Sequence, residues 1–329
     1  METSTTPQLT QESIDIASRN PLITLNNGQK MPQVGFGTFK ADEGENIEQL
    51  IKDAVLKYGY RHIDTAKVYF NEEKIGCALK ECITVGGVKR EELFITTKLY
   101  HDADKQNVEV ACRAQLAKLQ LEYLDLYLVH WMAPYIDWNA ENPVQQTPAH
   151  EVWAQMERLV DLGLVKSIGV CNCSSPMMLD LLTYAKIKPV VNQIELHPYL
   201  MQKEYVDFIR NKFNIHVTAY APLGAANWTF KKPEYNDKNL LKEPIITELA
   251  AKYEKSVGTI ILNWHTTHRG HIVIPKTSKE GRLRENIDIF DFKLTEEEYA
   301  QIDMLNCGAR FYDPLYFSYG IWKNWPYFS

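Results

Sequence analysis

From about residue 34 to about residue 290, the apolar and polar positions form a strand-like pattern and a helix-like pattern in alternation. Short apolar or alternating runs predict strands, and longer stretches with apolar residues three and four positions apart predict helices. The run 124–130 is the clearest strand, because Leu recurs at every second position. The predicted strands span residues 34–37, 60–63, 93–98, 124–130, 165–170, 190–194, 215–220 and 272–274. The predicted helices span about 47–58, 71–79, 108–119, 148–162, 176–184, 203–211, 244–253, 257–268 and 279–285.

Eight strand–helix units therefore follow one another without a linker. Such a run, with right-handed crossovers, closes as a (β/α)8 TIM barrel, and this is the predicted α/β fold. A doubly wound sheet is the runner-up. It needs a third glycine in a Gly-x-Gly-x-x-Gly turn after the first strand, but Gly35-Phe36-Gly37 is followed by Lys40. We predict one barrel domain over residues 21–329.

Several segments lie outside this repeating pattern. Asn27-Gly28 predicts a β-hairpin before the first barrel strand. Residues 1–20 lack the basic flank and apolar run of a targeting segment, so a flexible N-terminal extension is expected. Two long loops, 131–147 and 221–242, follow the fourth and seventh strands. The C-terminal tail, 304–329, holds nine aromatic residues between Phe311 and Phe328, and its first half is expected to close one side of a pocket.

Charge and cysteine content narrow the functional class. The net charge of −6 gives no general attraction to nucleic acid or to anionic membranes. No apolar run approaches the roughly 18 residues that span a bilayer. Six cysteines show no metal-binding spacing, so reduced thiols and a cytoplasmic protein are expected. His265, His268 and His271 are expected at a helix end on the barrel exterior, with no metal bound.

Polar and aromatic side chains gather where the predicted strands end. In such a barrel the carboxyl ends of all strands face one mouth, where active sites lie. Asp64 and Tyr69 follow the second strand, Lys98 ends the third and His130 ends the fourth. A nearby cation is expected to lower the pKa of a tyrosine from about 10 toward neutrality, which suits a proton donor. Later strand ends supply Cys171, Asn172, Gln193, Glu195, Tyr220 and Lys276.

Three stretches, 59–72, 164–172 and 274–286, resemble the aldo-keto reductase superfamily. Within it, the chain is most similar to the aldose reductase and xylose reductase branch. The hairpin at 25–32 and the segment 192–199 also resemble that branch. The resemblance covers residues 22–286. It implies an oxidoreductase that uses NADPH, with NADH as a weaker alternative, to reduce aldehydes, aldoses and other carbonyl compounds to alcohols.

The resemblance also implies roles for the residues at the mouth. Tyr69 would donate the proton, and Lys98, Asp64 and His130 would complete a catalytic tetrad. Elementary chemistry agrees, because the Lys98 ammonium favours the phenolate and Asp64 would keep that ammonium charged and in place. The hydride would come from a nicotinamide, since no side chain can supply one.

The residues that the resemblance assigns to the cofactor form a larger set. Lys276, Thr277, Ser278 and Arg282 offer two cations and two hydroxyls to the 2′-phosphate of NADPH. Cys171 and Ala221 depart from the branch, which often has Ser at both positions. The full set is Gly37, Thr38, Phe39, Asp64, Cys171, Asn172, Gln193, Tyr220, Ala221, Pro222, Leu223, Gly224, Lys276, Thr277, Ser278, Arg282, Glu285 and Asn286.

The substrate is expected to be a small carbonyl compound. Phe39, Tyr69, Tyr100, His130 and Trp131 would line its pocket. Two alternatives stay open: a reductase specialised for sugar phosphates or ketones, and a non-catalytic barrel protein, since fold alone does not determine function. No nucleic-acid or membrane partner is expected, and the protein is expected to be a monomer or a homodimer.

Overall fold

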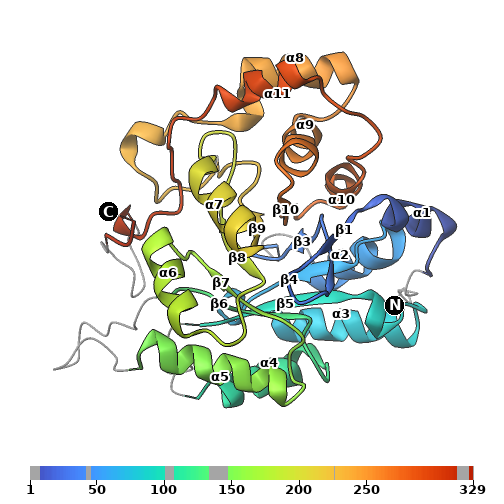
Figure 1. Ribbon diagram of the computed structural model, residues 1–329. Coiled ribbons are helices and arrows are strands. Elements are labelled where there is room, and N and C mark those ends of the chain that lie inside the picture. Colours follow the sequence, from blue (N-terminus) through green and yellow to red (C-terminus); the bar gives the residue numbers. More distant parts are fainter. Residues whose placement is uncertain are drawn as a thin grey trace.

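The computed structural model describes residues 8–41, 46–100, 107–132, 147–225, 227–316 and 326–328. Its centre is an eight-stranded parallel sheet in the order β10-β9-β8-β7-β6-β5-β4-β3 (Figure 1). Backbone hydrogen bonds close this sheet into a barrel, because Gly35 N donates to Val273 O at 2.8 Å and Gly37 N donates to Pro275 O at 3.2 Å. The predicted (β/α)8 barrel is confirmed. Its strands are β3 (Phe36–Gly37), β4 (His62–Asp64), β5 (Phe94–Leu99), β6 (Leu126–Val129), β7 (Ile168–Cys171), β8 (Val191–Glu195), β9 (His216–Tyr220) and β10 (Ile272–Val273).

Helices form the outer layer around these strands (Figure 1). They are α2 (Ile47–Lys52), α3 (Glu72–Thr84), α4 (Val108–Leu119), α5 (Ala149–Asp161), α6 (Ser175–Tyr184), α7 (Lys203–Phe213), α8 (Pro244–Tyr253), α9 (Val257–Asn263) and α10 (Glu280–Ile287). π-helical turns extend α2 over Asp53–Lys57 and α9 over Trp264–His268. No helix in the described ranges is long and apolar enough to cross a membrane.

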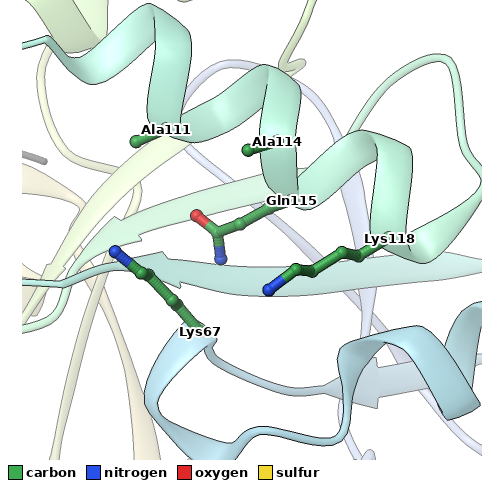
Figure 2. A pocket seen from close by; sticks show the side chains of 5 residues that line it. All are labelled: Lys67, Ala111, Ala114, Gln115 and Lys118. Carbon is green, nitrogen blue, oxygen red and sulfur yellow. The ribbon is translucent and has the colours of Figure 1, made fainter.

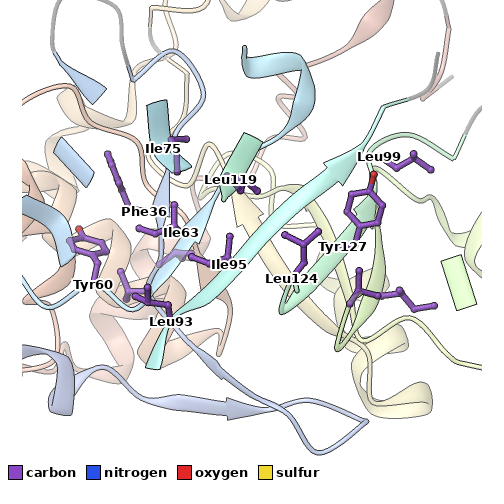
Figure 3. Packing of buried hydrophobic residues seen from close by; sticks show 14 of the residues in the cluster. Phe36, Tyr60, Ile63, Ile75, Leu93, Ile95, Leu99, Leu119, Leu124 and Tyr127 are labelled. Carbon is purple, nitrogen blue, oxygen red and sulfur yellow. The ribbon is translucent and has the colours of Figure 1, made fainter. Parts of the chain in front are cut away.

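The main apolar core lies between the strands and this outer layer. Figure 3 shows Ile63 and Ile95 from adjacent strands close to Ile75 of α3 and Leu119 of α4, and all four side chains are buried. Helices α3 and α4 approach closely at Gly76, where a Cβ atom would lie 2.2 Å from the carbonyl oxygen of Lys118. This dense packing gives the strand ends a rigid support.

Outside the barrel, the predicted hairpin is present as β1 (Leu22–Thr24) paired with β2 (Lys30–Pro32). The expected flexible extension is wrong for residues 8–20. Helix α1 (Gln11–Arg19) begins with a capping box at Thr10, and Ile16 is buried against the barrel. Gly59 permits this packing, because a Cβ atom there would lie 2.2 Å from Ser13 O. Residues 1–7 of the predicted extension, 133–146 of the first long loop, and 317–325 and 329 of the tail lie outside the described residues.

Helix α11 (Glu296–Asp303) is a second element that the apolar pattern did not predict. Thr295 caps it, and Tyr299 and Ile302 are its buried apolar residues. It lies beside α8 on the outside of the barrel (Figure 1). Only these two apolar positions face inward, which is too few to give a clear helical period in the sequence.

Two of the three histidines expected on the exterior, His265 and His271, are buried instead. His265 was expected on the barrel exterior, but it is fully buried, and its Nδ1 lies 3.0 Å from Nδ1 of His271. The backbone after α9 turns this side chain inward, toward the end of β9. Among the described residues, no group of three His, Cys, Asp or Glu side chains is arranged to hold a metal ion.

Candidate active site

A buried ion pair occupies the centre of the barrel mouth. Lys98, near the end of β5, is completely buried, and its Nζ lies 2.5 Å from Oδ1 of Asp64 at the end of β4. The same ammonium donates to Thr65 O at 2.8 Å and lies 3.3 Å from the hydroxyl of Tyr69. The structure thus brings three of the four predicted tetrad residues into one hydrogen-bonded group.

Burial controls the protonation of this group. It raises the pKa of Tyr69 to about 12, although the neighbouring Lys98 ammonium acts to lower it. The expected shift toward neutrality is therefore wrong in direction, because loss of hydration outweighs the charge of Lys98. Burial is the largest single influence on Lys98 and acts to lower its pKa, but the charge and hydrogen bond of Asp64, together with Tyr69 and Cys171, raise the pKa above its ordinary value of 10.5. At neutral pH the pair is an ammonium beside a neutral phenol.

The second oxygen of Asp64 is also bonded. Gln193 of β8 donates from Nε2 to Oδ2 of Asp64 at 2.8 Å. The carboxylate therefore holds Lys98 through one oxygen and Gln193 through the other, which orients both side chains. Thr38, after β3, donates through its hydroxyl to the backbone oxygen of Asp64 at 3.0 Å and supports the same strand end.

His130 lies at the end of β6, opposite the phenol. Its ring centroid is 6.1 Å from that of Tyr69 and 6.3 Å from that of Tyr100, edge-on in both cases. Asn172 donates from Nδ2 to His130 O at 3.2 Å and accepts from the Tyr220 hydroxyl at 2.8 Å. The mouth thus brings together residues from β4 to β9, as the strand-end argument predicts.

Aromatic rings extend from the phenol around one side of the mouth. Phe39 lies 5.0 Å from Tyr69 and 6.4 Å from Trp228, between ring centroids. Trp228 stacks on Tyr312 at 4.6 Å, and Tyr312 contacts Tyr220 edge-on at 5.6 Å. The sequence prediction missed Trp228 and did not single out Tyr312, because both lie in irregular segments whose position depends on tertiary contacts.

A second aromatic contact lies on the other side. Trp131 is buried and meets Tyr327 of the tail edge-on at 4.9 Å. The Tyr327 hydroxyl donates to the backbone oxygen of Asn172 at 2.8 Å. The end of the tail therefore touches the mouth as well.

The loop after β9 turns sharply at the mouth. Ala221 has a φ of 47° and Gly224 a φ of 70°, and Gly224 N donates to Ala221 O at 2.9 Å. The oxygen of Pro222 accepts from Nε2 of the buried His265 at 3.1 Å. The turn over 221–224, which includes Leu223, is therefore held from inside the protein.

The predicted phosphate side lies beyond β10. Lys276 bridges to Gly37 across the closure of the barrel, and its side chain is exposed, as is that of Arg282 in the first turn of α10. Thr277 is buried and accepts from Lys279 N at 2.9 Å. Ser278 is half-buried, Asn286 is buried and Glu285 is exposed. Exposed cations at the start of a helix form an environment suited to phosphate.

Cys171 ends β7 beside Asn172. Its side chain is only 1% exposed, and burial raises the pKa of its thiol. Cys171 is paired in the sheet with Gln193, the residue that donates to Asp64. Because its pKa is raised, the buried thiol of Cys171 is neutral at neutral pH.

A polar network that the sequence prediction missed lies behind the ion pair. Glu72, the first residue of α3, accepts through Oε1 from the Thr97 hydroxyl at 2.6 Å and from Gln115 Nε2 at 2.9 Å. Gln115 also donates to Lys98 O at 3.3 Å and accepts from the Tyr127 hydroxyl at 2.6 Å. In the sequence, the signal for this network was that Glu72 lies only three positions after Tyr69.

A small open hollow lies next to this network (Figure 2). Gln115 lies at its centre, with Lys67 on one side and Lys118 on the other, and Ala111 and Ala114 complete its lining. Gln115, which donates to Lys98 O, connects the hollow to the strand that carries Lys98.

The geometry agrees with comparisons to known proteins. Residues 33–306 match the model of the Aldo/keto reductase family. The chain is 43% identical over 305 residues to aldo-keto reductase family 1 member A1 of Bos taurus, which covers 89% of this chain and 91% of that protein. It is 40% identical over 310 residues to aldose reductase C of Dictyostelium discoideum, with 89% and 92% covered. Among solved structures, an aldo-keto reductase of Bombyx mori in complex with NADP superposes with a TM-score of 0.78 at 38% identity, covering 88% of this chain and 94% of that one.

Proposed function

The chain belongs to the aldo/keto reductase family and is an NADP-dependent oxidoreductase of the aldose and aldehyde reductase type, and from this premise we propose that it reduces aldehydes, aldoses among them, to alcohols. One observation carries the proposal: the buried ammonium of Lys98 lies 3.3 Å from the hydroxyl of Tyr69. A binding protein on the same barrel has no need for this arrangement. Residues 21–329 would act as one catalytic domain that includes the tail.

Carbonyl reduction adds a hydride to carbon and a proton to oxygen. When bound, NADPH supplies the hydride. Tyr69 gives its proton to the developing alkoxide, and the O–H bond of the phenol breaks as that of the alcohol forms. Lys98 stabilises the phenolate left behind, and Asp64 holds Lys98 in place through the 2.5 Å contact. His130 orients the carbonyl oxygen from the opposite side.

The residues present fit a nicotinamide dinucleotide. Asn172 and Gln193 offer amide groups to the carboxamide, and Tyr220 offers a ring face at the end of β9. The turn over 221–224 suits the pyrophosphate, because turns with left-handed residues, such as Ala221 and Gly224, can form anion-binding concavities. Lys276 and Arg282 are exposed beside α10, where they suit the 2′-phosphate.

Aromatic rings support an aldehyde as the substrate. Phe39 contacts the ring of Tyr69, and Tyr100 contacts that of His130. Further aromatic contacts at the mouth come from Trp131, Trp228 and Tyr312. These rings provide apolar contact area, and polar groups of the tail would admit sugars. Medium-sized aldehydes therefore fit this pocket better than sugar phosphates, since no cation is among these lining residues.

Absorbance of reduced nicotinamide tests the proposal. The purified protein is incubated with NADPH or NADH and a panel of aldehydes, ketones, aldoses and sugar phosphates. We expect NADPH oxidation that depends on the aldehyde and exceeds that with NADH. If NADPH binds, as measured by quenching of tryptophan fluorescence, but no carbonyl compound is reduced, the proposed function is wrong.

A further inference from the structure

Glu195 at the end of β8 directs its carboxylate toward the C-terminal tail. Its side chain is completely buried. Oε1 accepts from Phe311 N at 2.7 Å, and Oε2 accepts from Tyr312 N at 2.9 Å. Nε2 of the buried His197 lies 2.9 Å from Oε1 and is the third hydrogen-bond partner of this carboxylate. The carboxylate and these two consecutive backbone amides are here called the tail clamp.

Burying a carboxylate is costly unless hydrogen-bond donors surround it. The donors of the clamp therefore offset the cost of burying Glu195. His197 contributes a donor and also stacks its ring on Phe311, with centroids 4.9 Å apart and planes 19° apart. Phe311 is itself buried beside Tyr199 and Tyr235. This side of the tail is therefore tied to the barrel by both hydrogen bonds and packing.

The next residue, Tyr312, is half-buried and contacts residues at the mouth. Its ring stacks on Trp228 at 4.6 Å and meets Tyr220 edge-on at 5.6 Å. Trp228 in turn contacts Phe39, which contacts Tyr69. The clamp therefore positions Tyr312, which connects through Trp228 and Phe39 to the ring of Tyr69.

We propose that Glu195 is a positioning residue that fixes Tyr312 as a rigid wall of the substrate pocket and so sets which aldehydes are accepted. This proposal rests on the proposed reductase function. Glu195 touches neither substrate nor cofactor in it and acts through the tail. The pocket would discriminate by the size of the aldehyde, because the Tyr312 ring connects to Tyr69 only through Trp228 and Phe39 in this series of contacts, so a small aldehyde bound at the phenol would not need it.

Kinetics with paired substrates tests the proposal. Glu195→Gln keeps the volume but replaces one acceptor oxygen with an NH2 group, which faces a backbone N–H. We expect the KM for a bulky aromatic aldehyde to change by about tenfold, and the KM for a three-carbon aldehyde to change less than about twofold. Glu195→Asp, which keeps the charge but is shorter, should lie between parent and Glu195→Gln. Tyr312→Ala should have the same selective effect, and combining it with Glu195→Gln should add little, because both act through one wall.

Limited trypsin digestion supplies a readout that does not depend on activity. Cleavage after Arg310 requires the Phe311 amide to leave the clamp, so Glu195→Gln should accelerate it about tenfold. Unchanged cleavage, equal KM changes for both aldehydes, or additive effects in the double variant would overturn the proposal. If the parent reduces no aldehyde, the proposed function fails, and the cleavage rates still decide whether Glu195 holds the tail.

Discussion

At the scale of single residues, the chemistry of the mouth rests on charges that water does not reach. Lys98 and Asp64 are both buried and lie 2.5 Å apart. Removing one partner of such a pair leaves an uncompensated charge, at a cost of about 3–5 kcal/mol. Tyr69, which is half-buried beside this pair, also has a raised pKa, so its phenol stays protonated at neutral pH.

This protonation state predicts the pH dependence of the reaction. Burial raises the pKa of Tyr69 to about 12, and the phenol carries its proton below that pKa. The donor is therefore present through the neutral range and is lost only as the pH rises through the pKa. We expect kcat for aldehyde reduction, measured with saturating NADPH, to stay level from about pH 6 to about pH 9. A fall centred near neutral pH would show that Lys98 dominates instead.

Thiol reactivity is a second property of single residues. Cys307 is exposed, whereas Cys171 is buried and burial raises its pKa. Because the thiolate is the reactive form, iodoacetamide should label Cys307 well before Cys171. Peptide mass spectrometry would follow both sites, with Cys307→Ser as the control. Early labelling of Cys171 would contradict the buried position.

At the scale of elements, the start of α3 links the proton donor to the strand that carries Lys98. Asn71 donates to Thr38 O at 2.9 Å, and Glu72 holds Thr97 and Gln115. Burial raises the pKa of Glu72, and the hydrogen bonds from Thr97 and Gln115 oppose that rise. These contacts hold the Tyr69 loop against β5.

Replacing Glu72 should therefore affect both stability and rate. Glu72→Ala leaves two buried donors without their acceptor, which costs about 1–3 kcal/mol. We expect a lower free energy of unfolding in urea and a kcat reduced about tenfold, with NADPH affinity unchanged. Glu73→Ala is the matched control, because Glu73 is exposed on the same helical turn. Equal effects of the two substitutions would exclude this role for Glu72.

The pattern of apolar residues in the sequence predicts helices and strands that bury many apolar side chains. It misses helices that bury only one or two. Helix α1 buries one apolar residue, Ile16, and its capping box uses Ser13 where Glu or Gln is usual. Helix α11 has the usual Thr295-x-x-Glu298 box, which was the signal available for it. The strand-end rule predicted the ion pair, because parallel strands bring their carboxyl ends together. It did not predict the direction of Glu195, since that depends on a tail more than one hundred residues later.

At the scale of the whole molecule, the proposed cofactor site runs from α10 past the barrel closure to the ends of β7, β8 and β9. Its phosphate end has an exposed cation in Arg282. Glu280, two residues before, accepts from Lys57 and from the Tyr58 hydroxyl, both at 3.1 Å. The carboxylate nearest Arg282 in sequence is thereby bonded to the end of the π-helical turn that extends α2.

Coenzyme preference follows from this arrangement. Arg282→Ala should raise the KM for NADPH about tenfold and barely change that for NADH, because only NADPH carries the 2′-phosphate. Arg284→Ala is the matched control, since Arg284 pairs with Glu12 of α1 at 2.9 Å. Steady-state kinetics with both coenzymes measures the effect. Equal penalties for NADPH and NADH would show that Arg282 does not bind the phosphate.

The central claim is that the Tyr69 phenol donates the proton, and Tyr69→Phe tests it most directly. Tyr253→Phe serves as the control, because Tyr253 is bonded to Glu298 on the outer helices. NADPH affinity, measured by fluorescence quenching, should be equal in both variants and the parent. We predict that Tyr69→Phe lowers kcat for aldehyde reduction by about 10²–10⁴-fold while Tyr253→Phe leaves it unchanged. Turnover of Tyr69→Phe within about threefold of the parent would contradict the claim, because the loss of a general acid costs far more.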